Sequence, residues 1–220
     1  MQENIYKYRL KLTKTGALKF ISHLDWQGVI LKIFRRCGIE LVLSQGFNKM
    51  PKVSYSPALP IFIESDCELV NFQTYQKLDN TFVDDFQKNS PDGLRVVEFY
   101  EINDTVSLDN YVQWALYSAK IKNSVYNFNQ MRYIIEKCLS SNEFLILKKT
   151  KKGIEKTVNY RSSIKSIDFI DNTNLNFTLK AGASTEIPAL RADDFLKNLF
   201  EGVMFEIKRT EFLDADLKKI

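Results

Sequence analysis

The sequence predicts a mixed α+β protein in which a β-α-β-β-α-β order of elements occurs twice. Three observations support this prediction. A strand of alternating residues lies near the N-terminus, a capped amphipathic helix follows it, and the second half of the chain repeats the same order. This order with antiparallel sheets is that of a ferredoxin-like domain. We therefore predict two tandem ferredoxin-like lobes, residues 1–104 and 105–220, joined by a polar linker near 101–110.

The first lobe begins with the clearest patterns. Residues 6–13, YKYRLKLT, alternate apolar and basic side chains, as a half-buried strand does. The next helix, 22–38, starts with the capping-box pair Ser22 and Asp25, carries an apolar stripe and ends at Gly38. The further elements expected are a strand over 39–45, a hairpin of 61–65 and 68–75 turning near 65–66, a helix from 81 and a strand over 94–102.

The second lobe repeats the order with an inserted hairpin. Its expected strands and helices, in chain order, are a strand over 112–121, a helix over 127–141, a hairpin of 143–150 and 154–160, strands over 166–170 and 175–182, a helix over 191–200 and a strand over 203–213. The similarity between the two halves is one of pattern, because no residue-level repeat is visible.

Charge is distributed unevenly along the chain. The net charge is only +4, but residues 1–60 hold ten basic and three acidic side chains, a difference of +7. Residues 61–105 reverse this balance with three basic and ten acidic side chains, and a second basic cluster covers 148–165. Two basic blocks indicate a face that attracts polyanions such as RNA. The alternative is that the lysines only solvate strand edges and prevent their pairing.

Several classes of protein are disfavoured. No run of about 18 apolar residues is present, so we expect no membrane span. The polar N-terminus differs from a secretory signal, which favours a cytoplasmic protein. Three dispersed cysteines and one histidine predict no metal or iron–sulfur site, and we expect no cofactor. Common nucleotide-binding, hydrolase and zinc-protease motifs are missing.

The segment GFNKMPKVSYSPALP, 46–60, is the main candidate for a binding loop. Prolines at 51, 57 and 60 restrict its backbone, so we expect a semi-rigid loop. Such a loop suits single-stranded RNA, because cations follow phosphates while aromatic rings stack on bases. The proposed contacts are Phe47, Asn48, Lys49, Lys52 and Tyr55. The alternative is that both aromatic rings plug the sheet edge and the prolines only shape the turn.

Other residues extend or modify this hypothesis. His23 lies in the first turn of the capped helix, where the helix dipole favours a neutral ring that could act as a general base. The alternative is a structural histidine hydrogen-bonded near the cap with Asp25. Phosphate attraction is expected from the remaining basic residues, namely Arg35, Arg36, Lys148, Lys149, Lys151 and Lys152.

A known family resembles this sequence at several motifs. The motifs are KFISHLD (19–25), ILKIFRRCG (30–38), SQGFNKMPKVSYSPALP (44–60), IES (63–65) and IKRTEFL (207–213). They resemble a domain family of unknown function that is linked to radical-SAM proteins, and the strongest match covers 19–65. The family's loop usually reads G-F-N-P-H-P, whereas this chain has Lys49 and Met50 in place of the first proline and the histidine. The resemblance implies a role in RNA metabolism and a radical-SAM or ribonuclease partner.

We therefore expect an RNA-binding accessory protein in RNA maturation or modification. One alternative is a metal-independent endoribonuclease with His23 as general base. That hypothesis draws on a fold-level similarity to CRISPR repeat-processing nucleases, whose glycine-rich loop has only a weak counterpart here in 181–183. A further alternative is a protein-docking module for a radical-SAM enzyme. The chain lacks the C-x-x-x-C-x-x-C motif with which such an enzyme binds its iron–sulfur cluster.

Overall fold

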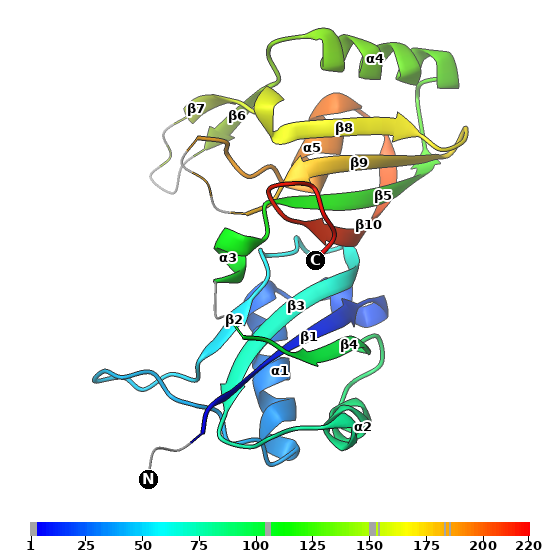
Figure 1. Cartoon of the computed structure of the whole chain (residues 1–220). Coiled ribbons are helices and arrows are strands. Elements are labelled where there is room, and N and C mark those ends of the chain that lie inside the picture. Colours follow the sequence, from blue (N-terminus) through cyan, green and yellow to red (C-terminus); the bar gives the residue numbers. More distant parts are fainter. Residues whose placement is uncertain (1–3, 104–106, 150–152, 154, 183, 185) are drawn as a thin grey trace. The chain divides into compact units, whose positions relative to one another are not determined.

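The computed structural model describes residues 4–103, 107–149, 153, 155–182, 184 and 186–220. The chain divides into two compact units, Met1–Tyr111 and Val112–Ile220. Each unit combines helices with an antiparallel sheet, so the predicted α+β class is confirmed (Figure 1). Within the described ranges, no helix has both the length and the apolar character needed to cross a bilayer.

The first unit contains an antiparallel sheet in the order β4–β1–β3, with β2 on the other edge of β3. Its elements in chain order are β1 (Tyr6–Lys14), a 3-10 turn (Gly16–Phe20), α1 (His23–Arg36), β2 (Val53–Tyr55), β3 (Glu64–Thr74), α2 (Asn80–Lys88), β4 (Val96–Glu101) and α3 (Leu108–Tyr111).

The core of this unit lies between one face of the sheet and helices α1 and α2. Strand β1 contributes Tyr8, Leu10 and Leu12, which are almost fully buried, as the alternation of its sequence predicts. The helices contribute Phe34 and Phe86, and the ring centroid of Phe34 lies 4.6 Å from that of Phe72 on β3 and 5.7 Å from that of Phe86. The basic residues of β1 therefore point to the opposite face of the sheet.

Helix α1 begins where the sequence predicts. Ser22 is its N-cap, and the Ser22 hydroxyl accepts a hydrogen bond from the backbone N–H of Asp25 at 3.1 Å. Gly38 follows the helix with a φ of 67°, a conformation that glycine adopts without strain.

Two expectations about the following segment are wrong. Residues 39–45 form no strand and make only isolated bridges, Leu41 with Thr74 and Leu43 with Pro51. The expected hairpin turn near 65–66 is also absent, because Glu64–Thr74 is one continuous strand with no glycine or proline to reverse it. The strand that pairs beside β3 is instead β2, within the proline-rich segment.

The second unit has a sheet in the order β10–β5–β9–β8 and a separate ribbon of β6 and β7. Its elements are β5 (Trp114–Asn123), α4 (Phe128–Ser140), β6 (Leu145–Lys149), β7 (Glu155–Asn159), a 3-10 turn (Arg161–Ser163), β8 (Ile164–Phe169), β9 (Asn174–Lys180), α5 (Ala192–Leu199) and β10 (Met204–Leu213). The core contains Tyr117, Phe177 and Phe195, whose rings are in contact.

The division between the units falls at Tyr111 and Val112, later than the expected boundary between 104 and 105. Two contacts attach the short helix α3 to the first unit. The Leu108 N–H donates to the Ser54 hydroxyl at 3.2 Å, and the Arg9 guanidinium lies 4.9 Å from the centre of the Tyr111 ring.

We expect Phe34→Ala to lower the free energy of unfolding by about 3–5 kcal/mol, because it empties the centre of an aromatic cluster. Phe47→Ala is the matched control, because the Phe47 side chain is fully exposed, and it should change stability by less than about 0.5 kcal/mol. Urea unfolding followed by near-ultraviolet circular dichroism measures both. A Phe34→Ala loss below about 1 kcal/mol would contradict the packing described for the first unit.

Candidate nucleic-acid interface

A protruding loop carries most of the predicted contact residues. The Ser44 N–H donates to the Met50 carbonyl at 2.8 Å, and the Met50 N–H donates to the Ser44 hydroxyl at 3.0 Å. These bonds close the base of the loop, while residues 45–50 are all exposed. Figure 1 shows this loop projecting from the first unit between α1 and β2 in sequence. The loop is thus fixed at its base and open to solvent at its tip.

Phe47 lies at the tip with a relative exposure of 104%. It therefore plugs no sheet edge, in contrast to the alternative considered from sequence. Lys49 and Lys52 are also exposed, and among the described residues neither makes an ion pair. An aromatic ring and two unpaired cations consequently share one hairpin, together with the exposed Asn48.

Tyr55 occupies a different environment from Phe47. It lies in β2, and its ring packs against Trp26 and His23 of α1, at 5.9 Å and 6.3 Å between ring centroids. Burial raises the pKa of the Tyr55 hydroxyl above its ordinary value. Tyr55 is therefore part of the wall beneath the loop and does not share its solvent-exposed tip.

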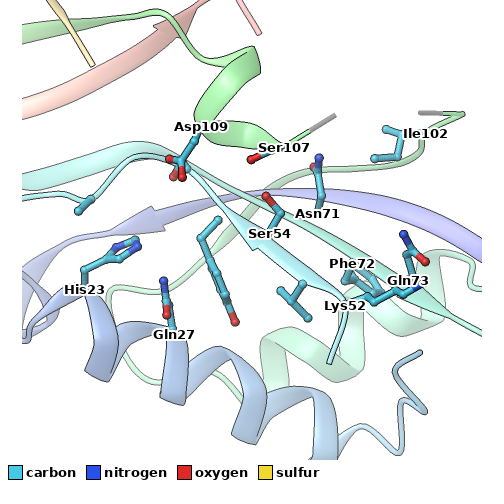
Figure 2. Close-up of a pocket in the computed structure, with 14 residues that line it drawn as sticks. His23, Gln27, Lys52, Ser54, Asn71, Phe72, Gln73, Ile102, Ser107 and Asp109 are labelled. Carbon is cyan, nitrogen blue, oxygen red and sulfur yellow. The ribbon is translucent and has the colours of Figure 1, made fainter. Parts of the chain in front are cut away.

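A pocket of about 750 Å³ surrounds β2. Its lining includes His23 and Gln27 of α1, Lys52 at the base of the loop, and Asn71 of β3 (Figure 2). Ser107 and Asp109 contribute from the α3 segment. Because side chains alternate along a strand, Tyr55 faces α1 whereas Ser54 lies beside Asn71 on the other face, so the pocket extends around the edge of β2.

Three buried polar atoms in the described chain have no hydrogen-bond partner, and they gather around this pocket. They are Trp26 Nε1, Tyr55 Oη and Asn71 Nδ2. Tyr55 and Asn71 line the pocket, and Trp26 packs against the Tyr55 ring. Each unpaired buried group lowers stability by about 1–3 kcal/mol, so native proteins keep few of them. All three can donate a hydrogen bond, and two of them, Tyr55 Oη and Asn71 Nδ2, belong to residues that line the pocket.

His23 lines the same pocket from the first turn of α1. Its imidazole is stacked against Trp26 at 6.0 Å and 23°. The Asp25 carboxylate accepts a hydrogen bond from the Ser22 hydroxyl at 2.6 Å. The structure thus places His23 with Lys52 and Tyr55 around one cavity, as a residue that a bound ligand could contact.

The arginines of α1 lie elsewhere. Lys32 and Arg36 line a separate pocket of about 410 Å³ beside Lys88. With 3.6 residues per turn, these two positions are about half a turn around the helix from His23 and Gln27. Arg35 is exposed in the last turn. The structure therefore does not bring Arg35 and Arg36 together with the loop contacts.

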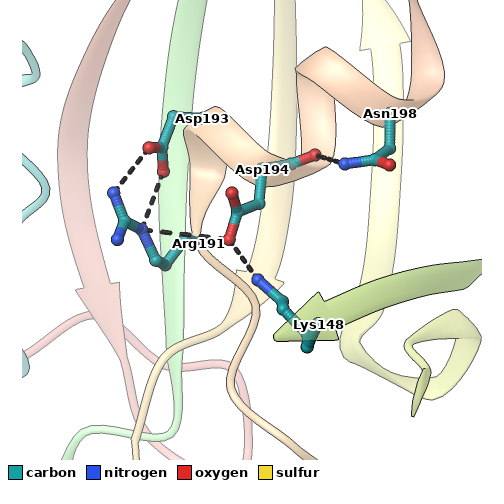
Figure 3. A network of polar contacts seen from close by, with 5 residues as sticks. All are labelled: Lys148, Arg191, Asp193, Asp194 and Asn198. Carbon is teal, nitrogen blue, oxygen red and sulfur yellow. Dashed lines mark hydrogen bonds and ion pairs between the residues drawn. The ribbon is translucent and has the colours of Figure 1, made fainter. Parts of the chain in front are cut away.

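The predicted phosphate-binding lysines of the second unit differ in their surroundings. Lys148 forms an ion pair with Asp194, which anchors β6 to α5 next to the Arg191–Asp193 pair (Figure 3). Lys149 is exposed and lies opposite Glu155 in the ribbon. Lys151 and Lys152 lie outside the described residues. No three described His, Cys, Asp or Glu side chains are placed to share a metal ion.

Sequence reasoning missed Asn71, Ser54, Gln27 and Asp109. Asn71 carried a signal, because it is a polar residue between Val70 and Phe72 in a strand that is otherwise largely buried. Its partner Arg9 is 62 positions away in sequence, so only the strand register reveals the pair.

Tyr55→Phe should maintain the free energy of unfolding at neutral pH or raise it by up to about 1 kcal/mol, since it removes an unpaired hydroxyl and keeps the ring. The folded state disfavours tyrosinate, whereas an unfolded tyrosine ionises near its ordinary pKa of about 10. Wild-type stability should therefore fall as pH rises above about 10, and the variant should lose less. Urea midpoints at pH 7 and 10.5 test this. A clear loss of stability in the variant at pH 7 would show that the hydroxyl has a partner.

Comparisons with known proteins identify the family of the chain. A family described as "Uncharacterized protein conserved in bacteria (DUF2344)" matches residues 7–189, and this description names no radical-SAM enzyme. No curated protein matches the chain. One chain of a solved structure titled "Crystal Structure of a Cbf5-Nop10-Gar1 Complex" is similar over 93% of this chain, with 12% identity and a TM-score of 0.45. The match spans about half of that chain, 48%, and is too weak to indicate a function. The protein belongs to the DUF2344 family of uncharacterized bacterial proteins.

Proposed function

We propose that this protein binds RNA as a non-catalytic accessory factor in RNA maturation or modification. The supporting observation is the loop that presents Phe47 fully exposed beside the unpaired Lys49 and Lys52. An exposed phenylalanine has no folded-state benefit at this tip, but it can stack on an unpaired base. The two cations can follow the phosphates on either side of that base.

The proposal includes two ferredoxin-like domains, which the sequence places at residues 1–104 and 105–220. It is supported by the element order of both units and by the strand orders β4–β1–β3–β2 and β10–β5–β9–β8. Strand β2 is an edge strand of the first sheet, and the pocket adjoins it. The proposed interface therefore lies on the first domain.

Single-stranded RNA fits the loop better than a duplex. Stacking on Phe47 requires an unpaired base, and a narrow A-form major groove does not admit side chains. The adjoining pocket, which Asn71 lines with an unpaired amide donor, also suits a ligand with neutral hydrogen-bond acceptors, such as the carbonyl oxygens and ring nitrogens of an unpaired base. Arg35, Arg36 and Lys149 would add only long-range attraction, because they lie outside the loop and the pocket.

A protein partner follows from the sequence resemblance and not from the geometry. We propose a radical-SAM enzyme or a ribonuclease in that role. Copurification of either enzyme with the tagged protein from its own cells tests this part separately, because RNA binding by the isolated protein requires no partner.

Phe47→Ala should weaken binding to single-stranded RNA by about 5- to 150-fold, which corresponds to one lost stacking contact of about 1–3 kcal/mol. Tyr133→Ala is the matched control, because Tyr133 is an exposed aromatic residue of α4 at 66%. Fluorescence anisotropy with a labelled mixed-sequence oligonucleotide measures both. Equal affinities for wild type and Phe47→Ala would contradict a stacking role for the loop.

Lys49→Ala/Lys52→Ala should reduce the slope of log K against log salt by about 1.4, because two phosphate contacts are lost. The control, Lys88→Ala/Lys137→Ala, removes the same charge from exposed positions on α2 and α4. An unchanged slope in the loop variant would place the phosphate contacts elsewhere. No RNA binding by the wild-type protein at low salt would reject the proposed function.

The second candidate function is a metal-independent endoribonuclease with His23 as general base. It is favoured by one observation, the position of His23 in the wall of the pocket that Lys52 also lines. His23→Ala separates the two functions. An accessory binder should retain its affinity within a few-fold and show no cleavage in either form, whereas a nuclease should cleave RNA as wild type and lose this activity in the variant.

A further inference from the structure

The face of the first sheet opposite the helices contains polar residues that the loop does not use. Arg9 and Asn71 lie on this face with relative exposures of only 8% and 6%. Burying a guanidinium and an amide is unfavourable unless their hydrogen bonds are satisfied. Asn71 Oδ1 has a hydrogen-bond partner in Arg9, whereas Asn71 Nδ2 has none, and Asn71 lines the pocket.

The Arg9–Asn71 hydrogen bond fixes the orientation of the amide. Arg9 Nε can only donate, and it lies 2.8 Å from Asn71 Oδ1. The amide oxygen therefore faces the arginine, and the Nδ2 group is directed away from it. That NH₂ group is buried and has no acceptor. The Asn71 side chain extends toward the segment that carries Ser107 (Figure 2).

The segment opposite Asn71 is held in place by two contacts. The Ser54 hydroxyl accepts from the Leu108 N–H, and the Tyr111 ring lies over the Arg9 guanidinium. Ser107 and Asp109 consequently form the wall of the pocket across from the sheet. The same pocket thus offers a donor without an acceptor on one side and a carboxylate on the other.

We propose that this pocket receives one unstacked nucleotide of the bound RNA, whose base edge accepts a hydrogen bond from Asn71 Nδ2 and donates one to the Asp109 carboxylate. This inference rests on the proposed RNA binding and names the part of the RNA that the pocket recognises. The volume of about 750 Å³ lies within the range of pockets that hold small organic ligands, about 300–1,000 Å³.

A base fits the pocket better than a phosphate does. A phosphate offers only acceptors and carries negative charge, so Asp109 would repel it. A nucleobase edge presents donors and acceptors side by side and is neutral. Ile102 adds apolar surface to the lining on the Asn71 side of the sheet, which suits a face of a base. Lys52 lies at the rim on the loop side, where the phosphate of the same nucleotide would be placed.

The amide also limits which contact a base can make. Arg9 already donates to Asn71 Oδ1, so the group of the amide without a partner is the Nδ2 donor. The contact proposed for Asn71 is therefore donation to an acceptor on the base. Discrimination among bases therefore depends on which base places an acceptor opposite Asn71 and an N–H opposite Asp109.

Asn71→Asp is the most direct test. The new carboxylate keeps the oxygen that Arg9 contacts and removes the free donor, so the unfolding midpoint should remain near that of wild type. Binding of the four ribonucleoside 5′-monophosphates is measured one at a time by protein-observed NMR. At least one should shift the resonances of residues around the pocket, and Asn71→Asp should weaken it at least tenfold. Asp109→Asn, at an exposed position, provides a second variant that does not disturb the sheet.

RNA binding supplies the second readout. Asn71→Asp should lower affinity for the oligonucleotide at least tenfold. Asn71→Leu, which removes the same donor without adding a charge, should do so without changing the slope of log K against log salt, because a base contact and not a phosphate contact is lost. Phe47→Ala should weaken RNA binding yet leave mononucleotide binding unchanged.

The failures of the two proposals are distinguishable. RNA binding that depends on Phe47 but is unaffected by Asn71→Asp and Asp109→Asn would overturn the nucleotide pocket and leave the RNA-binding function standing. Mononucleotide binding that survives both substitutions would place the nucleotide elsewhere and would also overturn the inference. An absence of binding to RNA and to every mononucleotide would reject both proposals.

Discussion

The pairing of the three-residue strand β2 with β3 is the constraint on which the candidate interface depends. Val53, Ser54 and Tyr55 lie opposite Phe72, Asn71 and Val70 in an antiparallel register. Because successive side chains alternate, this register directs Tyr55 toward α1 and places Ser54 next to Asn71. A shift of this register by one residue would turn Ser54 toward α1 and Tyr55 toward the Asn71 face. The walls of the pocket that these two residues form would then be lost.

The prolines explain why β2 is short and why the loop protrudes. Pro51 precedes the strand and Pro57 follows it closely, and neither can donate to a ladder. The regular pairing of this segment with β3 covers three residues, and residues 45–50 before Pro51 form the exposed loop. The same feature that limits the strand therefore positions Lys52 between the loop and the pocket.

The fold was predictable wherever the signal is local. The Ser22 cap, the apolar stripe of α1 and the alternation of β1 all appear within a few residues and were confirmed. The second strand was misplaced because β2 is too short to show a period and is flanked by prolines. Of the candidate site, the exposed loop was suggested by its composition, and its role in binding stays a prediction. The Arg9–Asn71 pair was not predictable, because it joins strands across 62 positions of sequence.

The distribution of unpaired polar atoms argues that the region around β2 was not shaped for stability alone. Tyr55 and Trp26 could be replaced by apolar rings of similar size, and Asn71 by a residue without a free donor, with little change or a gain in folding stability. Departures from such local rules are expected where a protein binds something. The loop and the pocket would then make different contributions to the free energy of RNA binding. Exposed lysines and Phe47 supply affinity that depends on salt and little on sequence, whereas a buried, fixed donor can distinguish one base from another because a wrong base leaves it unpaired.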